Sequence, residues 1–207
     1  MTMEYEIEPI RGLPGNLPKG EHIVWQGTPD WRAFARSVFH TRLVMAWFLF
    51  VASLAFVGGG TGLSGAVITL LVAVLGLAVL GALAWAGARA TIYTLTNRRL
   101  VMRFGAAVPK AVNLPLSKIG SADVRPVGGG FVDIVLAPTE RFPLGWLQTW
   151  PHVRPWKVAE PQPMLRAVSE TFVPILADAL KSADPAVSGG VARQEAQAPI
   201  SGLEAAA

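Results

Sequence analysis

The 207-residue chain contains no cysteine, and only 15% of its residues are charged. The lack of cysteine excludes a zinc site with cysteine ligands, and it agrees with a protein whose polar part lies in the cytoplasm. The three histidines, His22, His40 and His152, stand in three different segments. We therefore predict solvated or interfacial histidines rather than ligands of a metal or a pigment.

Acidic residues that could act as a catalytic pair are also missing. Asp123, Asp133 and Glu140 have no histidine or lysine at a spacing typical of acid–base catalysis, so we interpret them as surface residues. We expect no catalytic residue, no bound cofactor, no metal and no enzymatic activity.

Charge is absent altogether from Leu43 to Ala88, a run bracketed by Arg42 and Arg89. One membrane-spanning helix needs roughly 20 apolar residues, so this run is long enough for two. Glycines within residues 58–65 mark the turn between them. We predict spans over about 43–57 and 66–88. A buried helical hairpin in a soluble protein is the alternative, but such helices normally keep a polar stripe, and the run begins too late for a signal peptide.

Arginines flank both ends of this run, and the connecting loop carries no charge. The positive-inside rule then predicts a multi-pass protein of the bacterial inner (intracytoplasmic) membrane with both termini in the cytoplasm. The formal net charge is +4. Because the basic residues gather near the membrane exit, anionic lipid is a better expected partner than nucleic acid.

A basic β-hairpin follows the second span. The segments 91–96 and 99–104 alternate with period two around Asn97 and Arg98. Arg98, Arg99 and Arg103 have two interpretations: ordinary positive-inside topology, or contact of the sheet with lipid headgroups or a partner.

The C-terminal part is rich in tryptophan and then becomes helical. Trp146, Trp150 and Trp156 are either core and interfacial anchors or a surface for partner docking. Residues 164–180 have the apolar spacing of an amphipathic helix, with Pro174 expected to kink or split it.

These features predict an α+β membrane protein in four parts. Residues 1–42 form a cytoplasmic leader with a short strand and an interfacial helix, and residues 43–88 form a transmembrane helical hairpin. Residues 89–181 form a cytoplasmic domain, a small antiparallel sheet or barrel capped by a C-terminal helix. Residues 182–207 are expected to be disordered.

Small residues are frequent in the second span, including Ala73, Gly76, Gly81 and Ala84. They permit close helix packing. Packing within the hairpin explains most of them, and self-association or a partner helix is a second use.

The string "YTLTNRRLVMRFG…NLPLSKIGSADV", with the earlier "HIVWQGTPDW", resembles the bacterial pleckstrin-homology-like (PH-like) membrane domains over residues 21–136. The segments "EPIRGLPGNLPKGEHIVWQGTPDW" and "HVRPWKVAEPQPMLRAV" are similar to the photosynthetic complex assembly family of purple bacteria (PuhB type).

This second resemblance implies a non-enzymatic assembly factor that holds nascent reaction-centre subunits through its PH-like domain. The alternative hypothesis is an anionic-lipid-binding PH-like protein that organises the envelope.

Overall fold

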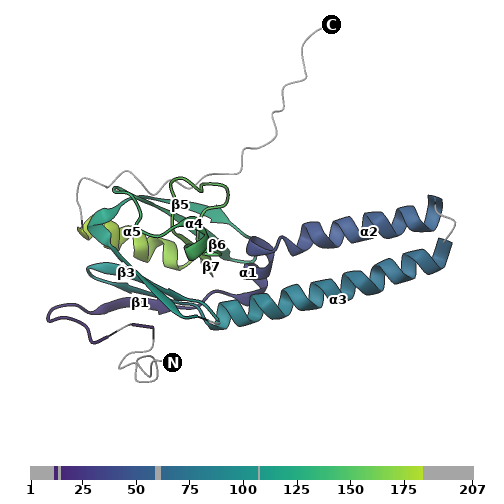
Figure 1. Cartoon of the computed structure of the whole chain (residues 1–207). Coiled ribbons are helices and arrows are strands. Elements are labelled where there is room, and N and C mark those ends of the chain that lie inside the picture. Colours follow the sequence, from purple (N-terminus) through teal and green to yellow (C-terminus); the bar gives the residue numbers. More distant parts are fainter. Residues whose placement is uncertain (1–11, 14, 59–61, 107, 184–207) are drawn as a thin grey trace, which may run out of the picture.

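A computed structural model describes residues 12–13, 15–58, 62–106 and 108–183. A globular α+β domain stands at the base of two long, nearly antiparallel helices (Figure 1). The predicted fold class is therefore confirmed. The predicted disorder of residues 182–207 falls almost wholly on residues 184–207, which lie outside the described part of the chain.

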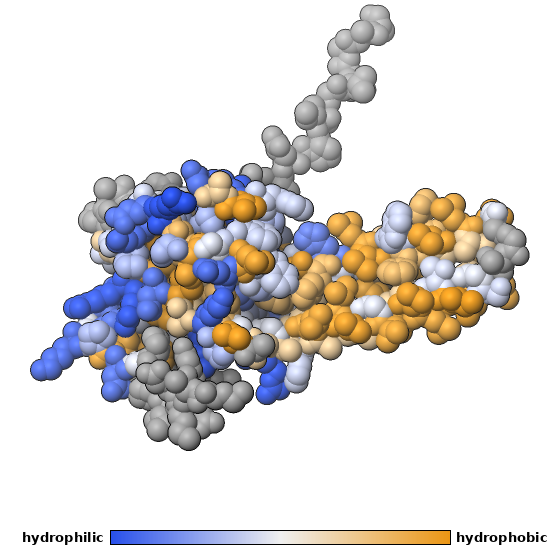
Figure 2. Space-filling model, viewed as in Figure 1, coloured by the Kyte–Doolittle hydropathy of each residue, from blue (hydrophilic) through white to orange (hydrophobic). Residues whose placement is uncertain are grey.

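The two long helices are α2 (Thr41–Gly58) and α3 (Gly62–Arg89). At 1.5 Å per residue they are about 27 Å and about 42 Å long, against a bilayer core of about 30 Å. Both are long and apolar enough to cross a membrane, and only 6% and 11% of their most apolar windows are buried within the protein. Figure 2 shows the result, an apolar rod projecting from a largely hydrophilic domain.

The domain contains two antiparallel sheets. The first has the order β1–β2–β3–β4, formed by Ile23–Gly27, Ile92–Thr96, Arg99–Phe104 and Lys110–Pro115. The second has the order β5–β6–β7, formed by Ile119–Pro126, Phe131–Pro138 and Met164–Ser169. The turn Leu116–Lys118 joins the two sheets. The predicted hairpin around Asn97 and Arg98 is confirmed, with Ile92 opposite Arg103 and Leu95 opposite Leu100.

Strand β1 corrects the predicted division of the chain. It precedes the long helices but pairs with β2, which follows them, so that Trp25 lies opposite Leu95. Helix α1 (Trp31–Val38) then packs on α3 and β7. Residues 23–38 are thus part of the domain rather than a separate leader, and the helical hairpin is an insertion between the first two strands.

The C-terminal helix α5 (Phe172–Ala183) covers the core between the sheets. Its Phe172, Leu176 and Leu180 recur every four residues and are buried, and Trp25 packs on Phe172 with ring centroids 4.0 Å apart. The predicted helix over 164–180 is wrong in its first part, because Met164–Ser169 is strand β7. Pro174 causes no break, since it occupies the first turn of α5, where an N–H would have no partner within the helix.

Helix α1 explains many of the small residues in α3. Asp30 caps α1, accepting a 2.8 Å hydrogen bond from the Ala33 amide, and Phe34 is buried against the last turns of α3. A Cβ built on Gly87 would lie 3.4 Å from the Phe34 ring. Ala84 and Ala88 are buried in the same region. These small residues let α1 fasten the long hairpin to the domain.

Candidate functional site

The three arginines of the basic hairpin do not form one group. Strand β2 begins three residues after α3 and runs away from it, so the turn at Asn97–Arg98 lies about 17 Å farther out. This turn is at the end of the domain opposite the long helices (Figure 1). Arg103, opposite Ile92, is at the near end. Headgroup contact through all three arginines on one surface beside the helices is therefore not supported.

Arg99 has a structural role. Its Nε donates to Glu21 Oε1 at 2.8 Å, and Thr96 Oγ1 donates to the same oxygen. Burial alone would raise the pKa of Glu21, but these hydrogen bonds and the charge of Arg99 outweigh it and leave the pKa lowered. Asn97 adds two contacts to the same segment, with the Gly20 carbonyl and the His22 amide. The Thr-Asn-Arg-Arg motif thus holds the start of β1 in the sheet.

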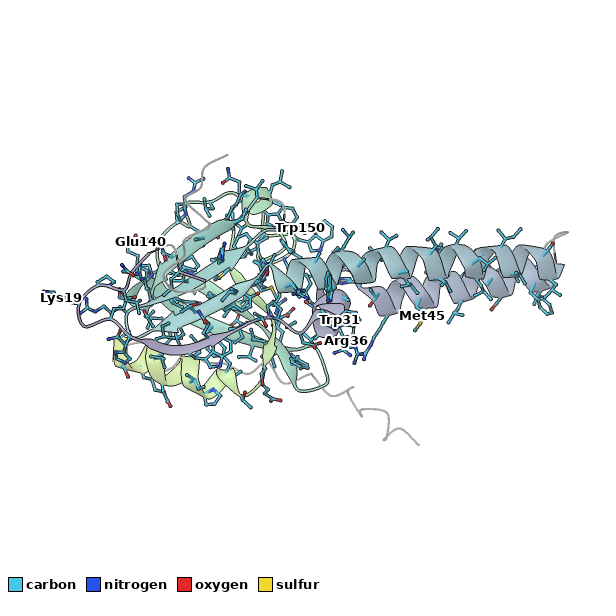
Figure 3. The ribbon with its side chains drawn as sticks, turned by 90° about the horizontal axis from the view of Figure 1, so that it is seen from below. Lys19, Trp31, Arg36, Met45, Glu140 and Trp150 are labelled. Atoms are coloured by element: carbon cyan, nitrogen blue, oxygen red, sulfur yellow. The ribbon has the colours of Figure 1, made fainter. Side chains whose placement is uncertain are left out.

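The tryptophan-rich segment forms a long loop between β6 and β7 that contains the short helix α4 (Trp146–Thr149). Trp146 is partly buried and donates its indole N–H to the Arg154 carbonyl at 3.0 Å, so it stabilises the loop itself. Trp150 and Trp156 are 47% and 94% exposed. Trp150 contacts Phe39 edge-to-face beside the base of the long helices (Figure 3).

Two further apolar residues of this loop, which the sequence prediction missed, are also exposed. Leu147 is 81% exposed and Val158 is 63% exposed. Together with Trp150 and Trp156 they form what we call the aromatic loop surface. Such exposed apolar groups are typical of docking sites, and aromatic residues often dominate binding energy there. Trp156 has φ 63°, a left-handed conformation that costs a non-glycine residue roughly 1–2 kcal/mol.

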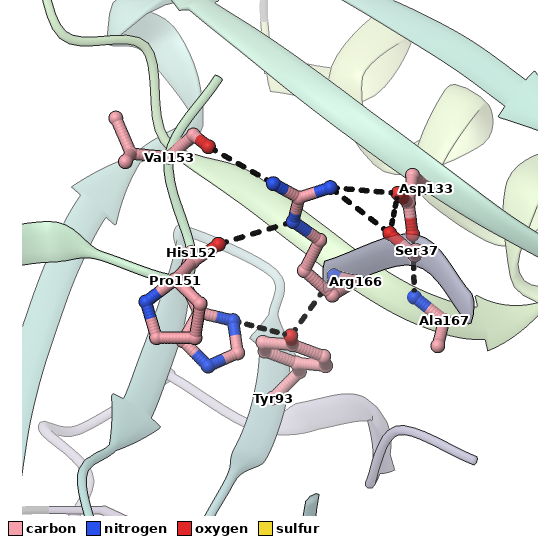
Figure 4. Close-up of polar contacts among 8 residues, drawn as sticks. All are labelled: Ser37, Tyr93, Asp133, Pro151, His152, Val153, Arg166 and Ala167. Atoms are coloured by element: carbon pink, nitrogen blue, oxygen red, sulfur yellow. Dashed lines mark hydrogen bonds and ion pairs between the residues drawn. The ribbon is translucent and has the colours of Figure 1, made fainter. Parts of the chain in front are cut away.

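A buried polar network holds the loop that carries the aromatic loop surface (Figure 4). Arg166 Nε donates to the Pro151 carbonyl at 3.0 Å, and its Nη2 donates to the Val153 carbonyl at 3.2 Å. Its Nη1 forms a 3.0 Å ion pair with Asp133 and also donates to Ser37 Oγ. Both members of the ion pair are 7% exposed. One arginine therefore ties the loop to β6 and α1.

Asp133 is fully engaged in this network. Its Oδ1 accepts from the Ala167 amide at 2.8 Å, and its Oδ2 accepts from Ser37 Oγ and Arg166. The prediction of a surface carboxylate at this position is wrong, because Asp133 lies at a bulge between β6 and β7 that turns it towards Arg166.

His152 extends the network to α3, and the prediction of a solvated histidine is wrong here because the residue is 1% exposed. Thr91 Oγ1 donates to the Gly87 carbonyl, so it must accept from His152 Nε2, 3.2 Å away. Tyr93 Oη accepts from the Arg166 amide and is 2.9 Å from His152 Nδ1, to which it donates. These contacts assign the neutral Nε2–H tautomer.

The surroundings of His152 agree with that tautomer. Burial and then the nearby charge of Arg166 lower the pKa of His152 to about 3. Burial also raises the pKa of Tyr93 well above its usual value. Both side chains are therefore neutral at physiological pH and act as fixed hydrogen-bonding links between the loop and the last turn of α3.

Comparison with known proteins supports the resemblance to the PH-like domains. The bacterial PH domain family matches residues 43–150. The chain is also 36% identical over 175 residues to an uncharacterized 23.7 kDa protein in the puhA 5′ region of Rhodobacter capsulatus, covering 81% of this chain and 82% of that protein. No solved structure matches the chain significantly. The family match spans the long helices and most of the strands described above, and the chain belongs to the bacterial PH domain family.

Proposed function

We propose that this protein is a non-enzymatic, membrane-anchored assembly factor for the photosynthetic reaction centre. The observation that carries the proposal is the 36% identical relative, which is encoded beside the reaction-centre gene puhA. Neighbouring bacterial genes commonly serve one process, and the two proteins match along most of their lengths.

Membrane anchoring through α2 and α3 is the first part of the proposal. Their large apolar side chains face outward along the whole hairpin, including Leu49, Phe56 and Leu75. The hydroxyls of Ser53 and Thr69 donate to carbonyls of their own helices at 2.8 Å, which removes the cost of placing them in lipid. Arg42 and Arg89 at the domain end favour cytoplasmic termini.

Partner docking through the aromatic loop surface is the second part. The contacts of Arg166, His152 and Trp146 fix the loop backbone between Trp150 and Trp156, so this backbone has little freedom to lose on binding, and preorganisation of this kind favours affinity. Trp150 lies next to the base of the hairpin, so a partner docked there would itself be at the membrane surface. Nascent reaction-centre subunits are partners of that kind.

The test is a deletion of the gene in a phototrophic host, complemented with the full-length protein or its variants. Loss of an assembly factor should reduce the amount of reaction centre, measured by membrane absorption and subunit levels, without changing the centres that remain. Trp150→Ala together with Trp156→Ala should reproduce the deletion while the protein stays in the membrane. Trp47→Ala, which removes an exposed tryptophan of α2, is the matched control and should restore wild-type levels.

Normal reaction-centre levels in the deletion strain during active synthesis would contradict the proposal. A reporter active only in the periplasm, fused after Ala207, tests the cytoplasmic position of the C-terminus separately and should be silent.

A further inference from the structure

A groove with a polar half and an apolar half lies where the helical hairpin meets the domain. The polar half, about 400 Å³, is lined by Arg36, His40, Arg42, Arg125 and Asp133. The apolar half, about 330 Å³, continues along the hairpin past Met45, Leu77 and Gly81. Arg36 and Arg42 line both halves, so the two lie next to each other. Figure 3 shows Arg36 and Met45 on the same side of the hairpin base.

The arginines of the polar half have unused hydrogen-bonding capacity. Arg36 is held in place by a 3.1 Å bond from its Nη2 to the Gly128 carbonyl. Its Nε is buried without a partner among the described residues, and so is the Nε of Arg125. A buried donor left unsatisfied is costly. Arg36 and Arg125 both line this cavity, and a turn of their guanidinium groups towards an acceptor in it would satisfy both donors.

The positive charge of the arginines in the polar half is not neutralised by a carboxylate of the described lining. Asp133 is the acidic residue in the described lining, and its two oxygens already serve Arg166, Ser37 and Ala167. Arg36, Arg42 and Arg125 therefore leave a net positive site, which suits a phosphate group. Arginine is well adapted to phosphate because its N–H groups match the oxygen geometry.

The apolar half suits a hydrocarbon chain. Leu77 and Gly81 lie one turn apart on α3, on the face that continues beyond the end of α1. A Cβ built on Gly81 would meet no other atom within 4 Å, so the glycine leaves the floor of the groove open. Met45 on α2 forms the opposite wall.

We infer that this groove binds one anionic glycerophospholipid, with its phosphate between Arg36 and Arg125 and an acyl chain along Leu77 and Gly81. The inference goes beyond the assembly role and rests only on the membrane insertion proposed above. The site is separate from Arg98 and Arg99, which belong to the turn between β2 and β3 at the end of the domain opposite the long helices. A lipid held there would fill the space between α1, α2 and β5.

The experiment uses the full-length protein in mild detergent, titrated with phosphatidylglycerol and, in parallel, with phosphatidylcholine, and observed by native mass spectrometry. Wild-type protein should retain phosphatidylglycerol in preference to phosphatidylcholine. Arg36→Gln combined with Arg125→Gln should weaken this retention at least about tenfold, the effect expected for losing hydrogen bonds between charged groups.

Two glycine variants keep the experiment decisive even if the arginine variant folds poorly. Gly81→Leu fills the apolar half while keeping every arginine, and it should also reduce retention. Gly76→Leu is the matched control, because its Cβ likewise meets open space but lies outside the groove lining, and it should retain lipid as wild type does.

Equal retention of the two lipids, or unchanged retention in the arginine or Gly81 variants, would overturn the inference. Displacement of the lipid by millimolar inorganic phosphate, with no effect of Gly81→Leu, would assign the site to a free anion and would also overturn it. Normal reaction-centre levels in the deletion strain would bear on the assembly role alone and would leave this inference standing.

Discussion

Replacing Arg166 by methionine should be among the most damaging single changes to the domain, because it removes one partner of a buried ion pair and keeps the other. Asp133 would stay buried with an uncompensated charge, and the Pro151 and Val153 carbonyls would lose their donor. Breaking a buried pair in this way typically costs about 3–5 kcal/mol. For a protein of this size 1 kcal/mol corresponds to about 2–4 °C, so the Tm should fall by roughly 6–20 °C.

The measurement is thermal unfolding of the full-length protein in detergent micelles, followed by tryptophan fluorescence. Lys118→Met is the matched control, because it also removes the cation of an ion pair, at 2.7 Å from Glu140, but both of those side chains are exposed. Exposed pairs contribute about 0–1 kcal/mol, so this variant should shift the Tm by at most a few degrees.

A double variant tests whether the effect arises from the pair itself. Arg166→Met with Asp133→Asn removes both charges, so its loss of stability should be smaller than the sum of the single losses by roughly 1–3 kcal/mol. Trypsin adds a local readout, since Lys157, followed by Val158, lies in the loop that Arg166 holds, and cleavage after Lys157 should accelerate in Arg166→Met. Additive losses, or a Tm for Arg166→Met no lower than that of the Lys118 control, would refute the reasoning.

Two further predictions concern the same framework. Folding keeps His152 neutral down to about pH 3, whereas an unfolded histidine titrates near pH 6.5. The contribution of neutral His152 to stability is therefore complete above pH 6.5. It is lost as the pH falls below that value, by up to about 1.4 kcal/mol per pH unit. His152→Gln should therefore flatten the fall in Tm between pH 7 and pH 4, and an equally steep fall in the variant would contradict this account. Gly87→Leu should force Phe34 away from α3 and destabilise the protein by about 1–3 kcal/mol. Gly76→Leu places its side chain in open space and should leave the Tm nearly unchanged. Equal Tm values for the two variants would show that α1 does not depend on the close approach at Gly87.

The features that the sequence predicted correctly are local ones. A charge-free run interrupted by glycines determines two long apolar helices wherever the rest of the chain lies, because helix formation and hydropathy depend on neighbouring residues. The alternation around Asn97 and Arg98 determines the β2–β3 hairpin for the same reason. The exposure of Trp150 and Trp156 excludes only a position in the core, and both interfacial anchoring and partner docking fit it.

Only the tertiary structure decided which distant residues meet. Strand β1 pairs with β2 across the whole inserted hairpin, and this pairing turns Arg99 from a free surface charge into the partner of Glu21. The same long-range packing buries His152 and Asp133, although histidine and aspartate are residue types that mostly lie at or near the surface. Arg36 and Arg125 line one groove only because α1 crosses the base of the hairpin beside β5. Contacts between residues far apart in the chain depend on how the elements pack, and local sequence patterns do not contain that information.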